Sequence, residues 1–127
     1  MTRDDVLDAC CALPGAVEEY PFGDGVAVFK VGGRMFALVP LAGEPATVNV
    51  KCEPELAVAL RAQHRAVLPG YHQNKRHWNT VELDGSVDDG ELRWMIEHSY
   101  GLVVAGLPKA ARDGLAAAAQ EGPRHER

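Results

Sequence analysis

Two apolar runs separated by a pair of glycines, residues 26–31 and 34–39, constrain the fold of this chain more than any other feature. Both runs are rich in the β-branched and aromatic residues that favour strands. The Gly32-Gly33 link favours a two-residue turn, because glycine adopts the positive φ angles that tight hairpins require. The pattern therefore predicts a β-hairpin in which Phe29 lies opposite Phe36 and Lys30 lies opposite Met35.

Periodicity predicts the remaining elements. Alternation of apolar and polar residues predicts strands over residues 46–52 and 78–83. Apolar residues spaced three and four apart predict helices over residues 3–13, 54–65 and 88–104. Two of these helices follow a capping-box pattern, Thr2-Arg-Asp-Asp5 and Ser86-Val-Asp-Asp89. The order helix, three strands, helix, one or two strands, helix is typical of an α+β domain with helices on one face of an antiparallel meander.

The length of 127 residues suits one domain with a buried core. We expect that domain over residues 1–109, and an alanine-rich extension over residues 110–127 that is partly helical and then disordered. No apolar run approaches the roughly 20 residues of a membrane span, and acidic residues come early in the chain where a secretory signal is apolar. We therefore expect a cytoplasmic protein, and a monomer.

The three cysteines lack the spacing of a disulfide framework or a metal site, so we expect reduced thiols and no bound metal.

Charge is unevenly distributed along the chain. The net charge is −5, which is unusual for a protein that binds nucleic acid. Residues 56–81, however, contain no Asp or Glu and carry Arg61, Arg65, Lys75 and Arg76. The sequence thus predicts one basic region in an otherwise acidic chain.

The segment Pro69–Thr80 concentrates cations, amides, imidazoles and aromatic rings within this region. One interpretation is a nucleic-acid site, with phosphates bound by cations, amide donors beside them and an aromatic ring stacked on a base. The candidate residues are Tyr71, Asn74, Lys75, Arg76 and His77, with Asn79 as a further amide and Trp78 as an alternative ring. Lys51, Arg61 and Arg65 would extend the basic surface, as would Lys30.

A second interpretation of the same segment is structural. Tyr71 and Trp78 would anchor a long loop in the core, His77 would bond a backbone carbonyl, and Lys75-Arg76 would form a solvated turn. A third interpretation is a pocket for a small molecule or a protein, built around Tyr71, His77 and Trp78. The sequence leaves these alternatives open.

Several spaced motifs resemble the MmcQ/YjbR family, over roughly residues 6–109. They are Pro14-Gly15, Tyr20-Pro-Phe-Gly23, Phe29-Lys30, Gly33-Arg-Met-Phe36, Asn49-Val-Lys-Cys52, Pro69-Gly-Tyr-His72, Lys75-Arg-His-Trp-Asn79 and His98-Ser-Tyr100. The resemblance implies a fold similar to CyaY, the bacterial frataxin, and a proposed role in binding DNA as a double wing. The acidic net charge and the alanine-rich C-terminal stretch depart from that pattern.

Catalysis is not expected. Cys52, Ser99 and Tyr100 are possible nucleophiles and several histidines are possible bases, but no nucleophile elbow, zinc spacing, phosphate loop or dinucleotide motif accompanies them. Asp4, Asp5 and Asp8 form too short an acidic ridge for iron binding in the manner of frataxin, and acids near a helix start have a dipole role in any case. We therefore expect a non-enzymatic module without a cofactor, with double-stranded DNA as the partner.

Overall fold

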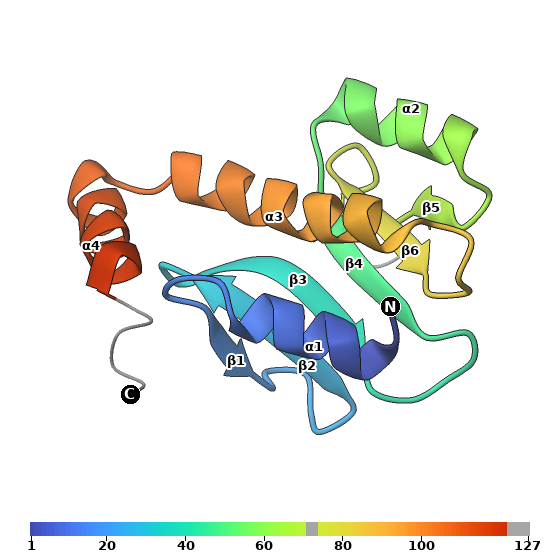
Figure 1. The fold of residues 1–127 in the computed structure, drawn as a ribbon, viewed down its shortest axis with the longest axis horizontal. Helices are drawn as coiled ribbons and strands as arrows, with labels where there is room; N and C mark the ends of the chain where they lie inside the picture. Colours follow the sequence, from blue (N-terminus) through green and yellow to red (C-terminus); the bar gives the residue numbers. More distant parts are fainter. Residues whose placement is uncertain (71–73, 122–127) are drawn as a thin grey trace.

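The computed structural model describes residues 1–70 and 74–121. Its ten elements confirm the predicted α+β class (Figure 1). They are α1 (Arg3–Cys11), β1 (Val17–Glu19), β2 (Val26–Val31), β3 (Arg34–Pro40), β4 (Thr47–Lys51), α2 (Pro54–Gln63), β5 (Val67–Pro69), β6 (Trp78–Glu82), α3 (Asp89–Ala105) and α4 (Lys109–Glu121).

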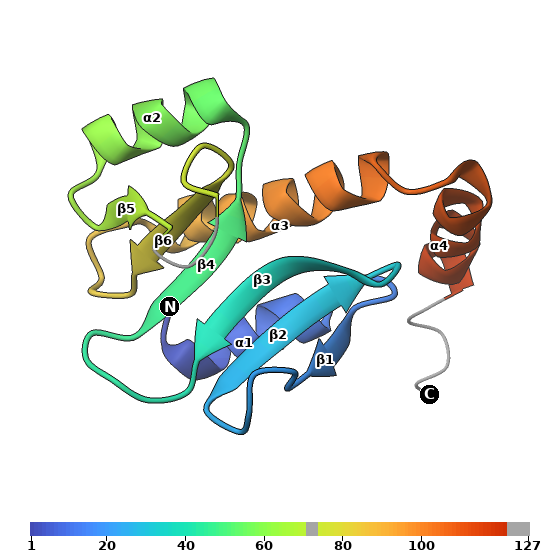
Figure 2. The same cartoon turned by 180° about the vertical axis from the view of Figure 1, so that it is seen from behind.

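The six strands form one antiparallel sheet in the order β1-β2-β3-β4-β6-β5. Helix α3 crosses β3 and β4, with α1 beside it, and α2 packs against β5 and β6 (Figures 1 and 2). Inward-facing residues of α1, α2 and α3 form one core with the strand residues beneath them. The helices therefore cover a single face of the sheet, as predicted.

The central hairpin confirms one half of the predicted register and corrects the other. Lys30 pairs with Met35 beside the glycine turn, as expected, but Phe29 pairs with Ala37 and not with Phe36. Phe36 is the extra residue of a β-bulge, which a strict alternation of residues cannot predict. Both phenylalanine rings still lie in the core, where both are 0 % exposed with their centroids 6.3 Å apart.

Strands β3 and β4 share only two register pairs, Ala37 with Val50 and Leu38 with Asn49. The next pair along the two strands would be Phe36 and Lys51. There, Ser99 of α3 lies between the two backbones. Its Oγ donates to the Phe36 carbonyl at 2.6 Å and accepts from the Lys51 amide at 2.8 Å. A helix side chain thus replaces the ladder where the two strands separate.

Helix starts and short strands differ in part from expectation. Thr2 and Asp5 form the predicted capping box. The second box was wrong, because Asp88 caps α3 by accepting from the amides of Gly90 and Glu91, while Ser86 bonds to Asp84. Strand β1 was not predicted, since three residues are too few to show alternation. Strand β5 supplies the second strand that the predicted order allowed after α2, but its residues had not been identified.

The chain beyond α3 folds back as α4, and its Leu115 packs near Gly15 and Val31. Residues 122–127, for which we predicted disorder, lie outside the described residues, and the domain boundary after residue 109 stays a prediction. Across residues 1–70 and 74–121, no helix is long and apolar enough to span a membrane.

Candidate nucleic-acid interface

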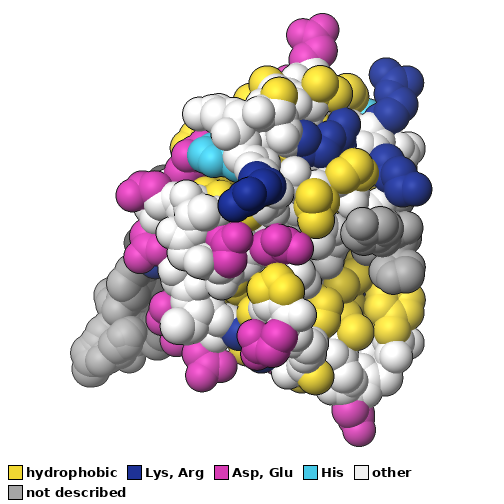
Figure 3. Space-filling model, turned by 90° about the vertical axis from the view of Figure 1, so that its right-hand side faces the viewer, with side chains coloured by type: hydrophobic (Ala, Val, Ile, Leu, Met, Phe, Trp, Pro, Cys, Tyr) yellow, Lys and Arg dark blue, Asp and Glu magenta, His cyan; other side chains and the backbone are white. Residues whose placement is uncertain are grey.

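A surface hollow of about 570 Å³ lies between α2 and the turn that precedes β6. We call it the basic groove; its lining residues are Pro54, Glu55, Val58, Arg61, Lys75 and Arg76. Figure 3 shows Lys and Arg side chains gathered in the upper part of the view, where α2 lies, while Asp and Glu lie mainly to the left and below. The charge segregation seen along the sequence is therefore also present on the surface.

Helix α2 contributes its outer face to the groove. Pro54 stands in the first turn, where its missing amide is not needed. Val58 and Arg61 follow at spacings of four and three, which puts the three side chains on one stripe. Ala57 and Leu60 lie on the adjacent side of the helix and are buried in the core. Burial of that inner stripe fixes the rotation of α2, so Arg61 faces the turn.

The turn is held by hydrogen bonds that its backbone amides and carbonyls make. Asn74 Oδ1 accepts from the Arg76 amide at 2.9 Å, and the Asn74 carbonyl accepts from the His77 amide at 3.0 Å. The His77 carbonyl accepts from the Cys52 amide at 2.7 Å, which ties the turn to β4. Asn74 thus shapes the turn, and the side chains of Lys75 and Arg76 stay exposed at its tip.

Arg61 links helix and turn. Its Nη1 donates to the Lys75 carbonyl at 3.1 Å and to Asn79 Oδ1 at 2.9 Å. Asn79 Nδ2 donates to the Ala57 carbonyl at 3.4 Å. Asn79 is only 2 % exposed, so it is part of the interior and not an amide presented to solvent as the sequence suggested.

The other candidate residues lie apart from the basic groove or are half-buried. Arg65 is exposed two residues beyond the end of α2, which is shorter than predicted. It lies near Asp84, whose pKa is lowered mainly by hydrogen bonds from Ser86 and also by the Arg65 charge. Lys51 is half-buried beside α3, and Lys30 Nζ lies 3.1 Å from Glu19 Oε1. His77 is half-buried in the turn. Tyr71 lies outside the described residues.

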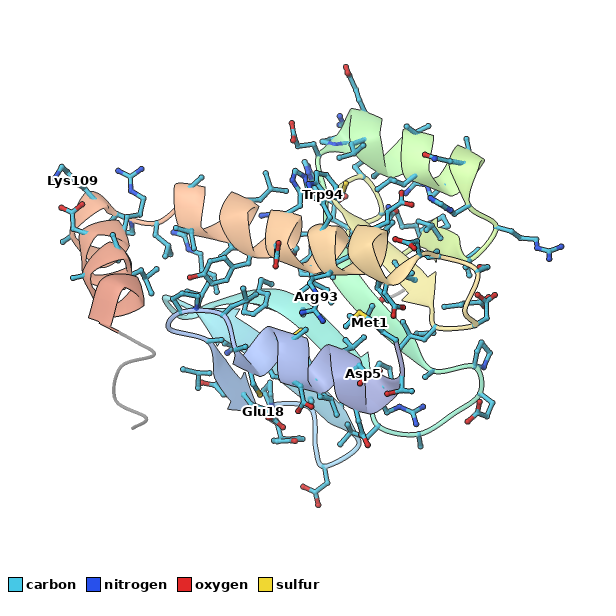
Figure 4. The ribbon with its side chains drawn as sticks, viewed as in Figure 1. Met1, Asp5, Glu18, Arg93, Trp94 and Lys109 are labelled. Atoms are coloured by element: carbon cyan, nitrogen blue, oxygen red, sulfur yellow. The ribbon has the colours of Figure 1, made fainter. Side chains whose placement is uncertain are left out.

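Trp78 is 8 % exposed and pairs with Lys51 in the sheet. This burial favours the structural interpretation of its ring over base stacking or a ligand pocket, because a stacking platform must be open to solvent. The exposed tryptophan of the chain is Trp94, at 46 %. It lies on the side of α3 that faces α2 (Figure 4) and stacks on His98, with ring centroids 4.6 Å apart.

Both ends of α2 are paired with α3. His64 Nε2 lies 2.9 Å from Glu91 Oε2, and His98 Nε2 lies 3.6 Å from Glu53 Oε1. His64 follows α2, so its hydrogen bond joins the two helices at that end, whereas at the Glu53 end His98 Nε2 lies close but makes no hydrogen bond to a described residue.

The possible nucleophiles have structural surroundings. Burial, followed by the Glu53 charge, raises the pKa of the Cys52 thiol, which favours the neutral form. Burial also raises the pKa of Tyr100, whose hydroxyl donates to the Pro14 carbonyl at 2.6 Å. Among the residues that the structure describes, no group of three His, Cys, Asp or Glu side chains is arranged to hold a metal ion.

Comparison with known proteins identifies the family. A family model described as YjbR matches residues 11–102. The chain belongs to the YjbR family. The Escherichia coli K12 protein named "uncharacterized protein YjbR" is 38% identical over 112 residues, which cover 88% of this chain and 95% of that protein. The Bacillus subtilis "uncharacterized protein YyaQ" is 40% identical over 60 residues, which cover 47% and 50% of the two chains.

Solved structures of similar proteins have the same fold. A crystal structure of a Deinococcus radiodurans protein matches with a TM-score of 0.84 and 41% identity, covering 91% of this chain and 88% of that one. A Pseudomonas syringae crystal structure matches with a TM-score of 0.71 and 27% identity, covering 81% and 99%. The YjbR relatives are named as uncharacterised proteins, so membership gives this chain a fold and a family but no activity.

Sequence reasoning missed three lining residues of the basic groove in this YjbR protein: Pro54, Glu55 and Val58. Val58 lies three residues before Arg61, and Glu55 and Pro54 lie three and four residues before Val58. These spacings place residues on one side of a predicted helix, and they were the available signal. That signal needed one more fact, the closeness of α2 to the turn, which only the fold supplies.

Proposed function

We propose that this YjbR family chain is a non-enzymatic, cytoplasmic protein that binds the phosphate backbone of double-stranded DNA through the basic groove. The observation that carries the proposal is the convergence of Arg61, Lys75 and Arg76 on one hollow, in a chain with a net charge of −5. The function requires no cofactor and no catalytic step.

Local charge supports binding despite the acidic total. Exposed charges more than about 8–10 Å apart are screened at physiological salt, so a phosphate in the groove responds mainly to the nearest side chains. Three of those are cationic and one, Glu55, is anionic. Acidic surface elsewhere would orient the protein on DNA by repulsion and lower its non-specific affinity.

Duplex DNA is favoured over single strands by the aromatic residues. Single-stranded sites rely on exposed rings for stacking, and none of the described residues that line the basic groove is aromatic. Trp78, the aromatic residue next in sequence to the turn, is buried. Among the described residues the groove is lined by cations and not by aromatic rings, which suits a phosphate backbone that keeps its bases paired.

Fluorescence anisotropy with a labelled duplex oligonucleotide tests the proposal across a range of salt concentrations. Three phosphate contacts predict a slope of about −2.7 in log affinity against log salt, and about −0.9 for the double variant K75A/R76A. The matched control is K109A/R112A, which removes two cations from the start of α4 and should bind like the wild type. Equal affinity and slope for the wild type and K75A/R76A would show that the basic groove does not bind DNA.

A further inference from the structure

We infer that Asn79 is a positioning residue of the basic groove, which holds Arg61 so that the free edge of its guanidinium group binds one phosphate in a bidentate manner. This inference rests on the proposed function and adds the residue that organises the site. It also names the geometry of the ligand that the site prefers.

The donors of Arg61 divide into two sets. A guanidinium group has five N–H donors, of which two belong to Nη1. Nη1 makes two hydrogen bonds, one to Asn79 Oδ1 and one to the Lys75 carbonyl, which uses both of its hydrogens. Within residues 1–70 and 74–121, no acceptor bonds to Nε or Nη2 of Arg61. These two nitrogens form one edge of the planar group, and our inference assigns that edge to the ligand.

Asn79 is built into the sheet so that it contacts one turn of α2 twice. It accepts from Arg61 and donates to the carbonyl of Ala57, four residues earlier on the helix. A buried amide is tolerated only when its polar groups are bonded, and an apolar side chain would fill the same space beside Leu60 without that requirement. The Asn79 amide bonds both the Arg61 side chain and the backbone of the same helical turn, so it can hold the guanidinium group in one orientation relative to α2.

The same guanidinium group sets the position of the other two cations. The Lys75 carbonyl accepts from Arg61, so the backbone from which the Lys75 and Arg76 side chains extend is tied to α2. A ligand then meets three cations whose relative positions are already set, which reduces the entropy lost on binding. Removal of Asn79 would release Arg61 first and the turn with it.

A free Nε/Nη2 edge selects a particular ligand chemistry. Two parallel N–H donors match two oxygens of a phosphate or a carboxylate, and lysine cannot replace that fork because its ammonium group acts as a point charge. The basic groove therefore prefers a phosphate that offers two oxygens to Arg61, with Lys75 and Arg76 on its flanks. A phosphodiester of the DNA backbone has two such free oxygens.

A double-mutant cycle on DNA affinity tests the inference. If Asn79 acts through Arg61, N79A weakens binding of the labelled duplex about fivefold to tenfold in the wild-type background and leaves it unchanged in the R61Q background. R61K, which keeps the charge but not the fork, should bind as weakly as R61Q. The matched control is N49A: Asn49 is also a buried sheet amide, bonded to Thr80 and to the Leu38 carbonyl, and lies outside the basic groove. N49A should lower thermal stability and keep the wild-type affinity.

Two results would overturn the inference: an equal effect of N79A in both backgrounds, or wild-type affinity for R61K. R61K decides the outcome if N79A does not fold. If the wild-type protein binds no duplex at all, the proposed function fails, and titration with inorganic phosphate judges the inference separately. The NMR signal of the Arg61 Nε–H group should then shift with phosphate in the wild type and in N49A but not in R61K, and no shift in the wild type would reject the positioning role.

Discussion

Leu107 packs over Gly32 at the tip of the central hairpin. A β-carbon at residue 32 would lie 2.6 Å from Leu107 Cδ1 and 2.8 Å from Cδ2, closer than side chains can approach. Gly33 beside it has open space in the same position, and both glycines have positive φ angles, +59° and +79°. The two residues of one turn therefore differ in packing and resemble each other in backbone conformation.

Alanine substitutions at the two glycines should separate these effects. G33A is expected to lose about 1–2 kcal/mol of unfolding free energy, because an L-residue is strained in the left-handed region. G32A should lose about 1–3 kcal/mol more unfolding free energy than G33A, because the Leu107 side chain must move away from residue 32. Urea denaturation of both variants measures the difference, and equal losses would contradict the packing between Leu107 and the turn.

Ser99→Ala should be strongly destabilising for its size. The substitution leaves the Phe36 carbonyl and the Lys51 amide without their bridge, and each unsatisfied buried group costs about 1–3 kcal/mol. Ser86→Ala is the matched control, since Ser86 is exposed and bonds only to Asp84 nearby. Thermal or urea unfolding of the two variants measures the contrast; a loss below about 0.5 kcal/mol for S99A would mean that water replaces the hydroxyl.

Native thiol reactivity should be confined to Cys11. Burial, followed by the charges of Cys11 and Glu18, raises the pKa of Cys10 from 9.0 to about 12, and Cys52 is also buried with a raised pKa. Cys11 is exposed. At pH 8, a chromogenic disulfide reagent should therefore modify one thiol per folded chain and three after unfolding. Rapid modification of all three in the native state would show that the core around Cys10 opens readily.

The raised pKa of Cys10 also sets a pH dependence of stability. The thiol in the unfolded chain loses its proton near pH 9, while the folded chain keeps it up to about pH 12. The unfolded state then binds fewer protons between these values, so stability is unaffected below pH 9 and falls as pH rises toward 12. The variant C10A, which has no thiol there, should lose less stability over that interval in urea titrations at successive pH values.

Fluorescence should distinguish the two tryptophans. Trp78 is 8 % exposed and Trp94 is 46 % exposed, so acrylamide should quench W78F, which retains Trp94, more strongly than W94F. Addition of duplex DNA should leave the Trp78 emission in W94F almost unchanged, because the ring does not line the basic groove. Strong quenching of Trp78 in the free protein would revive the ligand-pocket interpretation.

The sequence was sufficient for the fold class and for the elements long enough to show a period. The hairpin is the clearest example, since its turn and the Lys30–Met35 pair were predicted correctly. The register beyond Phe29 was not, because one extra residue at Phe36 changes which residues pair without changing which are apolar. The short strand β1 was missed, and the residues of β5 were not identified although a second strand was allowed there, because pairing with neighbours defines both strands and pairing is a property of the folded sheet.

The candidate site was predicted in its charges and not in its organisation. Arg61, Lys75 and Arg76 meet in the basic groove, since the acid-free run spans α2 and the turn that pack together. Asn79 was predicted within a strand and Asn74 in the loop before it, but both were considered as amides available to a ligand. Asn79 faces α2 from a strand and is buried, whereas Asn74 bends the turn and is exposed. The environments differ because β6, which carries Asn79, packs against α2, whereas Asn74 lies in the turn before β6.

The two register pairs between β3 and β4 make this the shortest ladder in the sheet. The sheet consists of two three-stranded halves, β1-β2-β3 and β4-β6-β5, with α3 packed over the line between them. The basic groove belongs wholly to the second half. We expect native-state hydrogen exchange to detect local opening of the hairpin half as a unit of lower protection that leaves the groove assembled. Insertions in the first half would then leave the basic groove of the second half unchanged.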